Sequence, residues 1–104
     1  MDADEIQKKF QTTIDEAVTG AGAKLDGDVR DIVSQFTREA ARQTERLDEY
    51  TQERAIDEGV AAYRKLVAQL VAAAKTYSMF PEVNKQAWDL AMMQLGPNPP
   101  FYYP

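Results

Sequence analysis

The sequence of 104 residues contains no cysteine and no histidine. Without cysteine the chain has no disulfide, no thiolate nucleophile and no cysteine-ligated metal site. Without histidine it lacks the usual general base of enzymes and the commonest ligand of transition metals. A helical di-iron site and a serine hydrolase triad both need histidine. We therefore expect a protein that is not an enzyme and that holds no metal and no cofactor.

Long apolar runs are also missing. The best apolar stretch covers 66–74, includes Gln69 and falls well short of the ~18 residues that a membrane span needs. The start of the chain, residues 1–5, is acidic, whereas a secretory signal peptide begins with basic residues. We expect a protein that neither spans a membrane nor is secreted by a signal peptide, and that resides in the cytoplasm or in a virion.

Only the first half of the chain has too few basic residues to balance its acidic ones. Residues 1–52 carry 12 acidic and 7 basic side chains, whereas residues 53–104 carry five of each, so the first half holds the whole net charge of −5. An acidic chain repels phosphate backbones, and we therefore expect no direct nucleic-acid partner. An acidic half is instead suited to a basic surface on a protein partner.

Glycine and proline are few, at five each, and they divide the chain into long intervals. Within each interval apolar residues recur every three or four positions, which is typical of amphipathic helices. The sequence therefore predicts an all-α fold with one helical domain over 1–95. The expected helices cover about 3–19, 28–52, 56–79 and 81–95.

The junction between the second and third of these helices has two interpretations. At ~100° per residue, the apolar stripes of 28–52 and 56–79 lie on opposite faces of one continuous helix. Either the helix breaks near 51–58 and folds back as a hairpin with one core, or one helix of roughly 75 Å runs through 28–79. Typical helix lengths favour the break, while the absence of glycine and proline from 51–58 favours continuity. A continuous helix would require an oligomer to cover both stripes.

The helix expected over 81–95 begins with Pro81, which suits a first helical turn, and it is apolar on two faces. Trp88 and Met92 lie off its inner stripe. A helix of this kind is either deeply buried or in contact with two partners, so the sequence places Trp88 either in the core of its own chain or at an interface.

The last nine residues, 96–104, include four prolines, which favour an extended, polyproline-like path. We expect a C-terminal arm whose aromatic residues contact either another chain or the helices of their own. Aromatic side chains often anchor protein interfaces. The predicted partner-binding residues are Trp88, Met92, Pro99, Pro100, Phe101, Tyr102 and Tyr103.

These observations favour a non-enzymatic structural or assembly protein that acts by helical packing and a C-terminal arm within a homo-oligomer or a larger complex. Extended arms of this style suit virions and other multi-subunit assemblies. The alternative is a small acidic regulatory binder, an inhibitor or adaptor, that docks on a basic partner. The paired carboxylates Asp48/Glu49 and Asp57/Glu58 are interpreted as exposed helix faces, and Asp26 or Asp28 as a helix cap rather than a calcium ligand.

Overall fold

The computed structural model describes residues 1–96, and this part of the chain confirms the predicted all-α class. Its helices are α1 (Ala3–Gly20), α2 (Gly27–Glu45), α3 (Glu49–Thr76) and α4 (Lys85–Leu95), with two short strands, β1 (Lys24–Leu25) and β2 (Glu82–Val83). The predicted contact residues Pro99, Pro100, Phe101, Tyr102 and Tyr103 lie outside the described residues.

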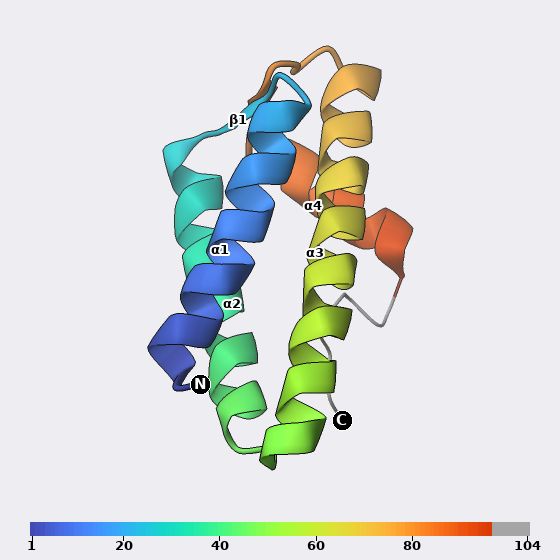
Figure 1. Cartoon of the computed structure of the whole chain (residues 1–104). Helices are drawn as coiled ribbons and strands as arrows, with labels where there is room; N and C mark the ends of the chain where they lie inside the picture. Colours follow the sequence, from blue (N-terminus) through green and yellow to red (C-terminus); the bar gives the residue numbers. More distant parts are fainter. Residues whose placement is uncertain (97–104) are drawn as a thin grey trace.

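Helices α1 and α3 run side by side in the same direction, and α2 runs in the opposite direction beside and behind α1 (Figure 1). Helix α4 crosses behind α3 (Figure 1). The start of α1 therefore lies at the same end of the molecule as the turn between α2 and α3. There the N-terminal ammonium of Met1 donates a hydrogen bond to Gln52 Oε1 over 3.0 Å, which ties the start of α1 to the first turns of α3.

Helix α1 follows the sequence pattern closely. The Asp2 side chain accepts a hydrogen bond of 2.9 Å from the backbone N–H of Glu5 and so caps the first turn. The predicted apolar stripe is buried along its length, at Ile6, Phe10, Ile14 and Val18.

The hairpin is the arrangement found between α2 and α3, but the helices separate at 46–48 rather than at 51–58. The Asp48 side chain accepts a hydrogen bond of 2.8 Å from the backbone N–H of Thr51 and starts α3. The segment 51–58 is helical throughout, as its lack of helix breakers indicates. Both apolar stripes thus face one core, and the stripes by themselves do not require a second chain.

The start of the last helix also differs from the prediction. Pro81 does not open a helix: it lies in the turn before β2, and its carbonyl accepts a hydrogen bond of 2.9 Å from the backbone N–H of Lys24. Residues 24–25 and 82–83 pair as a two-stranded parallel sheet. Helix α4 begins only at Lys85, after Asn84 accepts a hydrogen bond of 3.1 Å from the Ala87 N–H.

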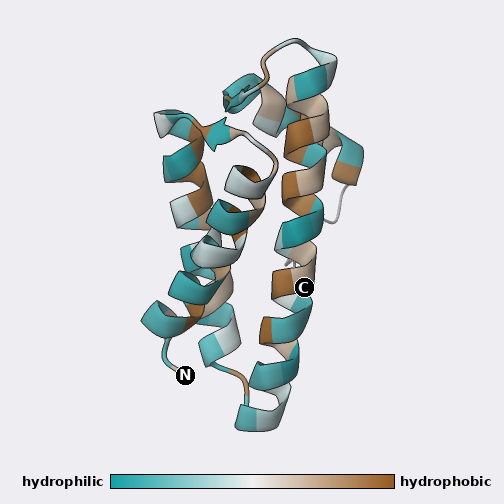
Figure 2. Cartoon of the chain, turned by 45° about the horizontal axis from the view of Figure 1, so that its top comes forward, coloured by the Kyte–Doolittle hydropathy of each residue, from teal (hydrophilic) through white to brown (hydrophobic). Residues whose placement is uncertain are grey.

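A chain of four aromatic rings joins the four helices. The ring of Phe10 lies 5.1 Å from that of Tyr63, Tyr63 lies 6.2 Å from Phe36, and Phe36 lies 5.8 Å from Trp88. The last two contacts are edge-to-face, a favourable geometry for aromatic pairs. Hydrophobic segments recur along one side of α3, while hydrophilic segments cover its other side (Figure 2).

Over residues 1–96, no helix is both long enough and apolar enough to cross a membrane.

Candidate functional site: the cleft between α1 and α3

Trp88, a predicted contact residue, is 8% exposed. Its indole packs edge-to-face on Phe36 of α2, so most of the ring is committed to the core of its own chain. The predicted second face of α4 therefore covers α2 as well as α3. Met92 is half-buried and packs against the same core, and part of its side chain is accessible to a partner.

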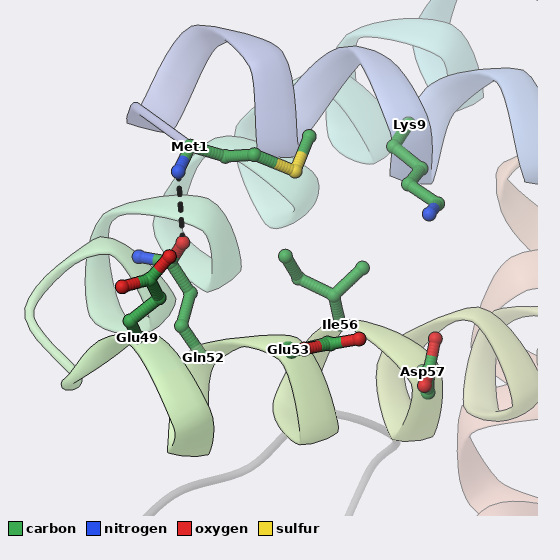
Figure 3. Close-up of a pocket in the computed structure, with 7 residues that line it drawn as sticks. All are labelled: Met1, Lys9, Glu49, Gln52, Glu53, Ile56 and Asp57. Atoms are coloured by element: carbon green, nitrogen blue, oxygen red, sulfur yellow. Dashed lines mark hydrogen bonds between the residues drawn. The ribbon is translucent and has the colours of Figure 1, made fainter.

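A depression lies elsewhere, between the first halves of α1 and α3 (Figure 3). It has a volume of about 350 Å³. Its apolar lining comes from Ile56, which is buried, and from Met1, which is 53% exposed. We call this depression the α1–α3 cleft. Its lining residues are Met1, Lys9, Glu49, Gln52, Glu53, Ile56 and Asp57.

The two walls of the cleft carry opposite charges. The α3 wall presents Glu49, Glu53 and Asp57, spaced four residues apart, and the α1 wall presents Lys9 (Figure 3). None of these four side chains forms an ion pair with another residue of 1–96. Their charged groups remain exposed to solvent and available to a partner.

A second depression continues from the cleft along α1. It is lined by Met1, Glu5, Lys8, Lys9, Thr12, Thr13 and Glu16. The two lysines are adjacent, and Glu5 and Glu16 lie on either side of them, so the positive charge of this wall is confined to one turn of α1. Continuing from the cleft along α3, the side chain of Tyr50 is 80% exposed and lines a third depression with Glu53, Arg54 and Asp57.

At the lower end of α3 the carboxylate of Asp48 has a perturbed titration. The hydrogen bonds that it accepts from Thr51 lower the pKa of Asp48 below its usual range, because they stabilise the ionised carboxylate. Asp48 is thereby kept ionised beside the positive end of the helix dipole, and it adds to the negative charge of this end of α3.

No protein family, curated protein or solved structure matches this chain. Its function is therefore inferred from its own surface. Within 1–96 no three acidic side chains are placed to hold a metal ion together. The cleft combines an apolar floor with two charged walls, and the exposed Tyr50 lies beside it; these features are typical of a protein contact surface.

The sequence-based choice of contact residues did not include the cleft. The acidic row at 49, 53 and 57 has a spacing of four, which places its members on one face of a helix, so the acidic wall is indicated by the sequence. The basic wall is not, because Lys9 comes next to this row only when α1 and α3 pack side by side. Tyr50 continues the apolar spacing of 28–52, but in the structure it lies in the first turn of α3 and its side chain is 80% exposed.

Proposed function

We propose that this protein is a non-enzymatic assembly protein that acts by contact with other protein chains in an oligomer or larger complex. The observation that carries the proposal is the α1–α3 cleft, whose charged walls have no ion-pair partners within residues 1–96. Unpaired charges around an apolar floor suit a protein surface of complementary charge. Virion and cytoplasmic assemblies both remain predictions made from the sequence.

Large apolar side chains on the surface support the same proposal. Tyr50 is 80% exposed and Met93 is 77% exposed, while Tyr77 and Phe80 at the opposite end of α3 are exposed by 52% and 38%. Single exposed apolar side chains are common on protein surfaces. Tyr50, however, lies beside the cleft, and tyrosine is among the residues that anchor protein interfaces most strongly.

The test is the solution mass of the full chain by sedimentation equilibrium from about 1 μM to about 1 mM, a range that covers weak as well as tight association. A defined oligomer supports assembly by self-contact. A mass that stays at one chain throughout this range contradicts it. The full chain carrying Phe101→Ala, Tyr102→Ala and Tyr103→Ala separates the predicted arm from the helical surface, because only an arm-mediated oligomer loses mass in this variant.

The acidic row of α3 favours one alternative, a regulatory binder that docks on a basic protein surface. Exposed charge contacts are screened by salt, so binding of this kind weakens sharply as ionic strength rises. Titration with a lysine- and arginine-rich helical peptide at low and high salt tests this alternative. Binding that is lost in Glu49→Gln/Glu53→Gln supports it, and an absence of binding at low salt rejects it.

A further inference from the structure

The α1–α3 cleft carries both signs of charge at one level of the molecule. Helices α1 and α3 run in the same direction (Figure 1), and Lys9 and Asp57 lie on opposite walls of the same cleft (Figure 3). The basic patch of α1, made by Lys8 and Lys9, therefore stands beside the acidic row of α3. A surface with a positive strip beside a negative strip is complementary to a rotated copy of itself.

The direction of the two-fold axis decides which charges of the two copies face each other. In a two-fold dimer each copy contributes the same surface patch. A two-fold axis parallel to the helices and in front of the cleft places α1 of each copy over α3 of the other, so Lys8 and Lys9 face Glu53 and Asp57. An axis across the helices at the level of Lys9 and Asp57 places α1 on α1 and α3 on α3, with like charges opposed. Like charges across an interface are costly, which leaves the parallel axis.

The surface around the cleft carries exposed apolar area that a dimer can bury. Ile56, on the floor, is already buried within its own chain, but the Met1 side chain, which lies across the cleft from it (Figure 3), is 53% exposed. Tyr50 stands beside the acidic row with most of its ring in solvent. An apolar centre enclosed by charged side chains is the usual anatomy of a protein interface.

We propose that the α1–α3 cleft is the site at which a second copy of this chain docks, with Lys8 and Lys9 of each copy against Glu53 and Asp57 of the other. This inference rests on the proposed function and deepens it, because it names both the partner and the surface. Glu5 and Glu16, on either side of the lysines along α1, limit the attraction to the middle of the cleft and thereby fix the register of the two copies.

The test uses two charge-reversed forms of the full chain. The first carries Glu53→Lys and Asp57→Lys, and the second carries Lys8→Glu and Lys9→Glu. Each form by itself opposes like charges in the dimer, so we expect its dissociation constant to rise at least about tenfold over that of the unaltered chain. An equimolar mixture restores opposite charges on both halves of the interface, so we expect a heterodimer with the affinity of the original.

A matched control carries Glu39→Lys and Glu82→Lys, which change the net charge as in the first form but lie on α2 and β2, outside the cleft. The control is expected to associate as the unaltered chain does. Circular dichroism confirms that every form is folded. Recovery of the original affinity on mixing the two reversed forms, with no loss of affinity in the control, establishes the docking site.

Three outcomes overturn this inference, and they separate it from the proposed function. An oligomer whose mass is unaffected by either reversed form places the contact on another surface and leaves the proposed function in place. Equal weakening in the control shows a general effect of net charge. An unaltered chain that remains a monomer contradicts both proposals for self-association.

Discussion

Replacing Phe36 with alanine tests the aromatic chain that attaches α4 to the other helices. The ring of Phe36 is in edge-to-face contact with Tyr63 at 6.2 Å and with Trp88 at 5.8 Å. Each such contact contributes about 0.5–1.5 kcal/mol beyond burial. Removing this half-buried ring also leaves a cavity. From the two effects together, we expect Phe36→Ala to lower the free energy of unfolding by about 2–4 kcal/mol.

The assay is urea unfolding followed by circular dichroism and by tryptophan fluorescence, because Trp88 is the single tryptophan of the chain. In Phe36→Ala we expect a lower midpoint and a red-shifted native emission, since the indole becomes exposed to water. Phe36→Leu is the matched control, which keeps apolar volume but removes the ring contacts, and it should lose about 1–2 kcal/mol. An unchanged midpoint and an unchanged native emission in Phe36→Ala would refute the proposed role of the aromatic chain.

Three further predictions concern single residues of the bundle. Gly22 has a positive φ of 74°, so Gly22→Ala should lower the free energy of unfolding by about 1–2 kcal/mol. Gly20 is the last residue of α1 and has open space around it, so Gly20→Ala should raise the free energy of unfolding by up to about 1 kcal/mol. Thermal unfolding of both variants tests this contrast. The pKa of Asp48 is lower in the folded chain than in the unfolded chain, so the ionised carboxylate stabilises the fold above the unfolded pKa, and this stabilisation is lost as the pH falls through the folded pKa. The unaltered chain should therefore be more stable than Asp48→Asn at neutral pH, and this difference should shrink below about pH 4. A difference that grows on acidification would contradict this. The buried Thr44 hydroxyl donates a 2.8 Å hydrogen bond to the Ala40 carbonyl of its own helix. Thr44→Val should leave the free energy of unfolding unchanged or raise it by up to about 1 kcal/mol. Thr44→Ser should lower it by about 1 kcal/mol, because the buried methyl group is lost.

The helices were predictable where local chemistry and burial agree. The three- and four-residue spacing of Ile6, Phe10, Ile14 and Val18 is plain in the sequence, and all four are buried along α1. The turn at 46–48 was misplaced because Leu47 and Tyr50 continue an apolar periodicity that the fold does not use. Asp48, followed by an acidic first turn, is the local sign of a new helix. At this junction the cap, and not the apolar periodicity, determines where α3 begins.

The strands and the cleft depend on contacts between distant parts of the chain. A two-residue strand has no periodicity to detect, and β1 and β2 exist because residues 24–25 meet residues 82–83. The cleft likewise requires Lys9 and Asp57, which are far apart in sequence, to face each other across two helices. A single sequence carries no signal for such pairings, whereas it does carry the spacing of Glu49, Glu53 and Asp57 along one helix.

The docking of two copies through the α1–α3 cleft can be measured directly by cross-linking, because the chain has no cysteine of its own. Lys9→Cys and Asp57→Cys are introduced into separate chains, the chains are mixed, and a short bifunctional thiol reagent is added. The parallel two-fold dimer predicts a covalent product that joins position 9 of one chain to position 57 of the other, and little product from either chain alone. Equal products from each chain alone, or no covalent dimer in the mixture, would contradict this arrangement.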